Sequence, residues 1–92
     1  MRESIIEKSV TQYAQSKGAL SFKVLSVNQR GLPDRAYLYK GETVYIEYKA
    51  TGRQPTAMQL KVHRDFLDVG VQVHVVNSIK QGLELIDALF PA

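Results

Sequence analysis

Two carboxylates and a lysine lie close together in the middle of the chain, at Asp34, Glu47 and Lys49. They accompany two short runs of β-branched and aromatic residues, 36–39 and 43–48, which are separated by a Lys-Gly turn. This pattern predicts a β-hairpin. Because side chains alternate between the faces of a strand, Glu47 and Lys49 are expected to project from the same face.

The turn decides how the two carboxylates are placed relative to one another. If Lys40 and Gly41 form a two-residue loop, Asp34 lies directly opposite Glu47, with Cβ atoms about 4.5–5.5 Å apart. A four-residue loop keeps Asp34 on this face, whereas a three-residue loop moves it to the other face. Two carboxylates this close repel each other, and a divalent cation held by their hard oxygen atoms would remove the conflict.

The same residues resemble a known nuclease motif. Pro33-Asp34 followed by Glu47-Tyr48-Lys49 is similar to the PD-(D/E)xK pattern. The run Gly-Leu-Pro-Asp-Arg that begins at Gly31, together with Gln59 at the start of a later helix, resembles the VRR-NUC branch. The resemblance covers nearly the whole chain and implies a single domain over residues 1–92. Its fold would be an α/β, restriction-endonuclease-like αβββαβα core with a mixed central β-sheet flanked by helices.

The resemblance also implies a metal-dependent reaction. Asp34, Glu47 and the backbone carbonyl of Tyr48 would bind Mg²⁺, for which Mn²⁺ can substitute. A divalent metal lowers the pKa of bound water and clamps the oxygens of a phosphodiester. Lys49 would position the nucleophile or stabilise developing negative charge. The plain alternative is a surface cluster of charges.

A further metal ligand is expected on the first helix. The spacing of Ile6, Val10 and Tyr13 predicts a helix over residues 1–17, which Gly18 ends. The resemblance implies that a glutamate of this helix completes the metal site. Glu7 is the first candidate and Glu3 competes with it. The alternative for both is a solvated charge that the helix dipole favours near the N-terminus.

A second helix is predicted over residues 55–69, with Pro55 at its first position. Gln59 faces inward in the first turn, where a polar side chain needs a partner. It would orient a metal-bound water or an acidic ligand, or else make a capping hydrogen bond. His63 follows one turn later and could reach the edge of the site, although a core or surface role is the alternative.

Basic and aromatic residues supply candidates for nucleic-acid contact. The candidate DNA-binding residues are Arg30, Arg35, Arg53 and Lys61. Arg53 belongs to a polar loop that borders the site, whereas Arg35 points away from Asp34 and could instead pair structurally. For Lys61 the alternative is a solvated helix face. The tyrosines of the hairpin are expected to pack in the strands, with base stacking as the alternative.

The remaining elements complete the predicted order. A strand with a bulge or twist is expected over residues 19–27, and a strand buried on both faces over 71–76. Ser78 is a good N-cap for the last helix, although Gly82 lies inside that helix. Apolar residues near the C-terminus could belong to the core or to a dimer contact.

Composition sets the outer bounds on function. The chain has 92 residues, a net charge of +3 and no cysteine, which excludes a disulfide scaffold and thiolate zinc sites. No run approaches the ~20 apolar residues that a membrane helix needs. We therefore expect a soluble protein of the bacterial cytoplasm, encoded by a bacterium or a phage. No nucleophile elbow or glycine-rich phosphate loop is visible.

The preferred interpretation is an endonuclease that cuts branched DNA, such as four-way (Holliday) junctions, as a homodimer. The substrate is implied by the resemblance to stand-alone VRR-NUC proteins. The dimer is also favoured by the small core of a chain this short. The alternatives are a non-catalytic DNA-binding module, and a nickase or flap nuclease without junction specificity.

Overall fold

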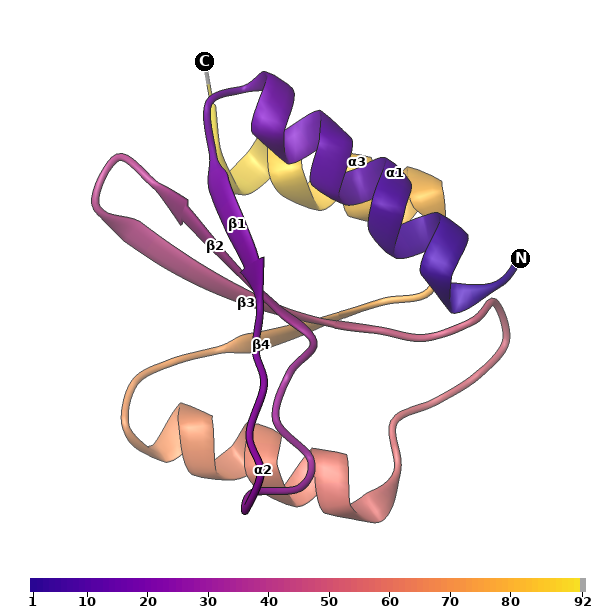
Figure 1. Cartoon of the computed structure of the whole chain (residues 1–92), viewed down its shortest axis with the longest axis vertical. Coiled ribbons are helices and arrows are strands. Elements are labelled where there is room, and N and C mark those ends of the chain that lie inside the picture. The colour runs from indigo at the N-terminus through magenta and orange to yellow at the C-terminus, as the bar shows by residue number, and fades with distance from the viewer. Residues whose placement is uncertain (92) are drawn as a thin grey trace.

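A four-stranded sheet separates two helical layers in the computed structural model, which describes residues 1–91. Helices α1 and α3 lie side by side over one face, and α2 covers the other (Figure 1). The elements follow one another as α1 (Glu3–Ser16), β1 (Leu20–Lys23), β2 (Arg35–Tyr39), β3 (Glu42–Tyr48), α2 (Ala57–Asp68), β4 (Val73–Val76) and α3 (Ile79–Leu89). This is the predicted αβββαβα order.

The sheet is mixed, as the sequence predicts. β1, β2 and β3 pair antiparallel in chain order, and β4 joins β3 in parallel. The β2–β3 loop consists of Lys40 and Gly41, with φ of 47° and 84°, the backbone that a tight hairpin turn requires. Because Arg35 pairs with Ile46, the next position places Asp34 opposite Glu47. The two-residue loop and the predicted register are therefore confirmed.

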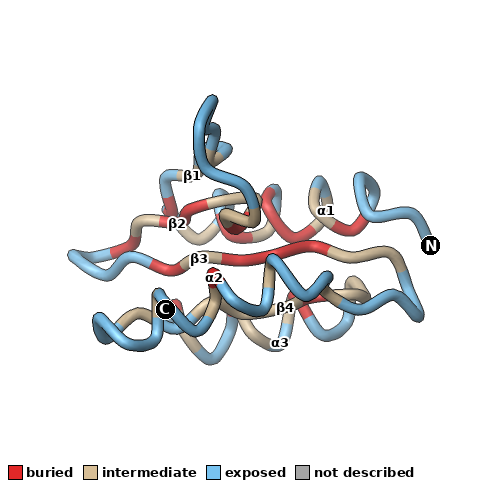
Figure 2. The backbone as a smooth tube through the Cα atoms, turned by 90° about the horizontal axis from the view of Figure 1, so that it is seen from below, coloured by how far each residue is buried: buried red, intermediate tan, exposed pale blue. Residues whose placement is uncertain are grey.

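The main core lies between the sheet and the α1–α3 layer. Fully buried residues of α1, β3 and α3 meet there, including Ile6, Ile46 and Ile86. Figure 2 shows the buried segments concentrated where the hairpin strands run beside the helices. Phe90 is fully buried in this cluster and Leu89 packs against it. The apolar residues near the C-terminus therefore belong to the core of the chain itself.

Gly82 explains how closely α1 and α3 approach each other. A Cβ at this position would lie 2.3 Å from Cγ2 of Val10 and 3.2 Å from Cγ1 of Val76. The glycine weakens the helix by about 1 kcal/mol relative to alanine, but a larger residue would overfill this contact. Close packing between helices is thus the reason for a glycine inside a helix.

We expect Gly82→Ala to lower the free energy of unfolding by about 1–3 kcal/mol, because overpacking outweighs the gain in helix propensity. Chemical denaturation measures the change. Val10→Ala should recover part of the loss in the double variant, although it is destabilising alone. Stabilisation by Gly82→Ala would show that the contact yields at no cost.

Three predicted boundaries are wrong. The first strand ends at Lys23 rather than at residue 27, because the chain turns away after Val24 and leaves Val27 fully exposed. The strand before the last helix covers only Val73–Val76, and only Val76 is buried, so it is not buried on both faces. The second helix begins at Ala57 with Thr56 as its N-cap, so Pro55 precedes the helix rather than occupying its first position.

The loop between β1 and β2 rests on α2. Gly31, at φ 81°, comes so close that a Cβ would lie 2.9 Å from Cγ2 of Val62 and 3.0 Å from the carbonyl oxygen of Met58. Pro33 follows and is fully buried. The glycine and proline therefore hold the backbone that leads into Asp34. Within residues 1–91, no helix is both long and apolar enough to cross a bilayer.

Candidate active site

Asp34 and Glu47 form the centre of the site. The backbone N–H of Asp34 donates to the carbonyl oxygen of Ile46 at 3.1 Å, which continues the hairpin ladder. Its Oδ2 accepts from the backbone N–H of Tyr48 at 2.7 Å. Glu47 is only 1% exposed, although glutamate is a charged residue when it faces water. A surface cluster of charges does not describe this arrangement.

The two carboxylates lie side by side, so burial and neighbouring negative charge both act on their pKa values. Burial, and next the negative charge of Asp34, raise the pKa of Glu47 to about 8. Burial also raises the pKa of Asp34, although the hydrogen bond from Tyr48 opposes that shift. Both acids therefore hold a proton more readily than in water, because their negative charge is incompletely compensated.

Helix α2 supplies a polar partner for Glu47. Gln59 completes a capping box with Thr56, since its Oε1 accepts from the Thr56 backbone N–H at 2.9 Å. Its Nε2 donates to Oε2 of Glu47, also at 2.9 Å. The two roles predicted as alternatives, a cap and a partner for an acidic residue, are both present. The cap anchors the amide that orients Glu47.

His63 approaches the other oxygen of the same carboxylate. Its Nε2 lies 3.8 Å from Oε1 of Glu47, and both atoms are buried without a hydrogen-bond partner within the described chain. Burial lowers the pKa of His63, and the positive charge of Lys49 acts in the same direction. Sequence reasoning gave this residue too little weight. The available signal was its position four residues after Gln59, on the same helix face.

Lys49 stands between the carboxylates and an open cleft. Its Nζ lies 3.9 Å from Oε2 of Glu47, and its side chain is 15% exposed. A cleft of about 610 Å³ is lined by Lys49, by the loop that follows it, including Arg53, and by Glu3 on α1. The loop therefore borders the site, as predicted. A substrate phosphate in this cleft would meet the ammonium group before the buried acids.

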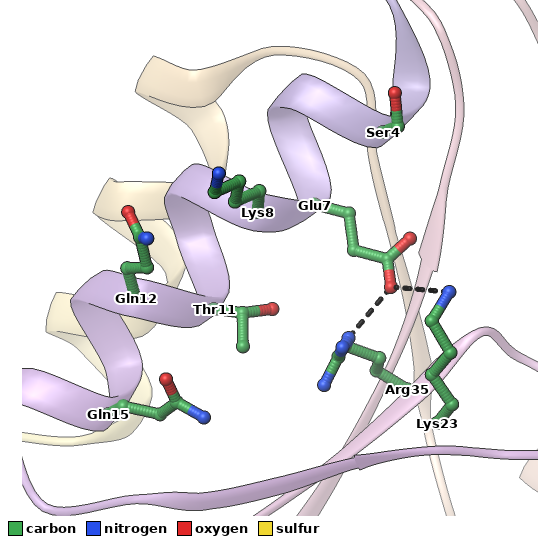
Figure 3. Close-up of a pocket in the computed structure, with 8 residues that line it drawn as sticks. All are labelled: Ser4, Glu7, Lys8, Thr11, Gln12, Gln15, Lys23 and Arg35. Carbon is green, nitrogen blue, oxygen red and sulfur yellow. Dashed lines mark hydrogen bonds and ion pairs between the residues drawn. The ribbon is translucent and has the colours of Figure 1, made fainter.

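The two candidate glutamates of α1 occupy different surroundings. Figure 3 shows Glu7 turned toward β1 and β2, where its Oε2 lies 2.7 Å from Nε of Arg35 and 3.5 Å from Nζ of Lys23. These residues belong to a polar cleft of about 360 Å³. Glu3 is largely exposed, and partial desolvation, followed by the negative charge of Asp34, raises its pKa. Glu7 is thus held by cations, whereas Glu3 faces the cleft of Lys49.

The structure spreads the predicted DNA-contact residues over several surfaces. Arg35 is engaged by Glu7 and donates to Oγ of Ser21 at 3.1 Å, so it has the structural pairing considered from sequence. Arg53 is exposed at the cleft. Arg30 is exposed in the loop before the hairpin, and Lys61 is exposed beside Asp65 on α2. Arg53 is therefore the member of this set that lines the cleft with Lys49.

Three of the four hairpin tyrosines are buried, and the fourth, Tyr45, is partly exposed. Tyr37 and Tyr48 are fully buried and share a 2.6 Å hydrogen bond between their hydroxyls. Tyr37 extends this to Oγ1 of Thr11 at 2.7 Å. Tyr39 is almost buried, and Tyr45 contacts Phe66 edge-on. Buried rings cannot stack on bases, so strand packing accounts for them.

The donor set at the centre fits a hard divalent cation. Glu47 carries a buried oxygen without a donor, and Asp34 adds a second carboxylate beside it. Oxygen atoms of this kind suit Mg²⁺, which needs few protein ligands because it keeps several waters. Within residues 1–91, no three acidic, histidine or cysteine side chains converge closely enough to form a complete metal cluster. The pair is therefore a partial ligand set.

A solved structure described as a VRR_NUC domain shares this architecture. It is 30% identical in sequence, with a TM-score of 0.85 over 92% of this chain and 94% of its own. With the Asp34–Glu47–Lys49 arrangement, this likeness defines the class as the PD-(D/E)xK fold. No profile of a known protein family matches the sequence.

A phage protein gives the second comparison. The chain is 37% identical over 79 residues to "Putative nuclease p44" of Acyrthosiphon pisum secondary endosymbiont phage 1. The match covers 85% of each chain. The protein therefore belongs to the VRR-NUC family of the PD-(D/E)xK nuclease superfamily.

Proposed function

We propose that this protein is a divalent-metal-dependent endonuclease that hydrolyses DNA phosphodiester bonds. The observation that carries the proposal is the buried Asp34–Glu47 pair beside the ammonium group of Lys49, at the edge of an open cleft. A protein that only binds DNA has no need to bury acidic charge near a polyanion. The phage relative, named as a nuclease, supports the same class of activity.

Each residue of the site has a separate task in this proposal. Asp34, Glu47 and the Tyr48 carbonyl would hold Mg²⁺ or Mn²⁺, and Glu7 or Glu3 is the candidate for a further ligand. The cation would supply a nucleophilic water at neutral pH and Lewis-acid stabilisation of the phosphate. Lys49 binds the scissile phosphate and stabilises the charge that develops on its oxygens. Gln59 holds Glu47 in place through Oε2.

The proposed DNA path starts at the cleft. Arg53 contacts the phosphates next to the scissile bond, because it lines the cleft with Lys49. Arg30 and Lys61 are exposed and contribute longer-range phosphate contacts. Arg35 acts through Glu7, whose carboxylate it holds. Loss of any one exposed arginine or lysine would weaken binding without removing the chemistry.

The proposed substrate is branched DNA, cut by a homodimer. A two-fold dimer carries two equivalent active sites, which suits the two symmetry-related strands of a four-way junction. Strand β1 is an edge of the sheet and exposes Leu20 and Phe22, with Leu25 and Val27 exposed beyond it. Exposed apolar residues at a sheet edge are a common site of association between chains.

Cleavage of a labelled four-way junction beside a matched linear duplex tests the function, in Mg²⁺, in Mn²⁺ and in EDTA. We expect paired cuts across the junction that require metal. Equal cutting of both DNAs would leave a nickase or flap nuclease, and binding without cutting in any metal would favour the non-catalytic module. Sedimentation of the free protein and of the complex measures the proposed dimer.

A further inference from the structure

Glu47 is held at one oxygen and unsupported at the other. Its Oε2 accepts from Gln59, whereas its Oε1 is buried and has no hydrogen-bond partner. A side chain that is 1% exposed cannot obtain the missing donor from bulk water. A buried acceptor without a donor is costly, so a donor for Oε1 is expected among the neighbouring side chains.

Nε2 of His63 lies 3.8 Å from Oε1 and is itself buried and without a hydrogen-bond partner within the described chain. Gln59 and His63 stand four residues apart on α2 and therefore share one face of the helix. The two side chains reach the two oxygens of one carboxylate. A shift of about 1 Å would bring Nε2 to hydrogen-bond distance from Oε1.

We propose that His63 is a positioning residue for Glu47, in the neutral tautomer that carries its proton on Nε2. The N–H then donates to Oε1 and satisfies both unpartnered atoms together. Gln59 and His63 form a two-point clamp that sets the rotation of the carboxylate about its last bond. This proposal rests on the proposed function, since the clamp matters because Glu47 is a metal ligand there.

The geometry favours this role over direct metal binding by His63. Within the described part of the chain, no three acidic, histidine or cysteine groups converge as a metal cluster, so His63 does not extend the Asp34–Glu47 pair into a ligand set. When Glu47 is ionised, as a metal ligand is, the opposite tautomer would leave Nε2 and Oε1 facing each other as two acceptors. In that state the Nε2–H form pairs them.

The tautomer can be read in the native protein without any substitution. Long-range ¹H–¹⁵N spectra of the imidazole groups distinguish the two neutral forms, recorded at pH 9 with and without Mg²⁺. We expect the Nε2–H form of His63 in both conditions, and a shift of its ring signals in Glu47→Gln. The Nδ1–H form would overturn the proposal. Signals of His74, which lies on β4 beside Ile46, serve as the reference.

Metal affinity gives the second readout. Groups that orient a metal ligand typically contribute 10–100-fold in affinity, so we expect His63→Leu to weaken Mn²⁺ binding by about that factor in calorimetry. His63→Gln restores a side-chain N–H and should recover most of the loss. His74→Gln is the matched control. Wild-type affinity in His63→Leu, or an equal loss in His63→Leu and His63→Gln, would contradict the donor role.

The two proposals fail in different ways. A wild-type protein that cuts no DNA in any metal contradicts the nuclease function, whereas the imidazole spectrum still decides the contact between His63 and Glu47. Conversely, metal-dependent cleavage with unchanged Mn²⁺ affinity in His63→Leu retains the nuclease and removes only the clamp.

Discussion

Lys49→Ala is expected to lower the rate of DNA cleavage by at least about 10²–10³-fold, the loss typical when one stabilising group is removed from a transition state. The ammonium group lies at the cleft, 3.9 Å from Oε2 of the buried Glu47, so the substitution removes positive charge from the site of the reaction. Single-turnover cleavage in Mg²⁺ measures the rate. Circular dichroism should show an unchanged fold, because the Lys49 side chain lies at the rim of the cleft.

Asp34→Asn is expected to cause a similar loss in the rate of DNA cleavage. An asparagine oxygen can still accept from the Tyr48 backbone N–H, so the local hydrogen bond is kept while the charge is removed. Lys80, exposed on α3 away from the cleft, supplies the matched control Lys80→Ala, which should cleave normally. Normal turnover in both Lys49→Ala and Asp34→Asn would contradict the assignment of the site.

The stability of the metal-free protein is expected to fall as the pH rises toward 8. Glu47 has a pKa of about 8 in the folded chain against 4.5 for an ordinary glutamate, so the folded state keeps a proton that the unfolded state has lost. The stabilisation is complete below pH 4.5 and disappears as the pH passes 8. Asp34, whose pKa is also raised, acts in the same direction.

The histidines restrict where this effect can be measured cleanly. Burial lowers the pKa of His63 and His74 from 6.5, which costs stability as the pH falls below that value. Between pH 6.5 and 8 we therefore expect the free energy of unfolding in EDTA to fall by roughly 2 kcal/mol, at about 1.4 kcal/mol per pH unit. Guanidinium titrations at several pH values measure it.

Glu47→Gln isolates the cause, because a glutamine at this position has no proton to lose. The variant should show little dependence on pH in this interval and should exceed the wild type in stability at pH 9. Glu84→Gln, at an exposed position on α3, should retain the wild-type dependence. Mg²⁺ should restore wild-type stability at high pH, because metal and proton compete for the same oxygens. A flat wild-type profile would mean that Glu47 is ionised without cost.

Local features of the sequence were sufficient to predict that Asp34 and Glu47 lie opposite each other. The Lys40-Gly41 turn sets the hairpin register, since the side-chain period of a strand leaves one arrangement once the loop length is chosen. Asp34 and Glu47 then meet without any knowledge of the rest of the fold. Gln59 was predictable for a similar reason, because the first turn of a helix places its residues through short-range capping contacts.

Local sequence patterns did not predict where the first strand ends, because that depends on a pairing strand from elsewhere in the chain. The strand expected over residues 19–27 shows alternation and apolar content, yet its second half has no neighbouring strand beyond Lys23 and leaves the sheet. Propensity measures how well a residue suits a strand, whereas a strand also needs a ladder to join. The fold decides whether that ladder exists.

Tertiary packing alone decided which long side chains meet. Glu7 pairs with Arg35 because α1 lies across β2, and His63 approaches Glu47 because α2 lies against the opposite face. A glycine is needed at position 82 because Val10 of α1 leaves no room for a Cβ there. The sequence therefore determined the family, the register and the acidic pair, which depend on turns and short periods. The tertiary structure determined the environment of Glu7 and His63, because contacts between distant segments depend on how each helix is placed on the sheet.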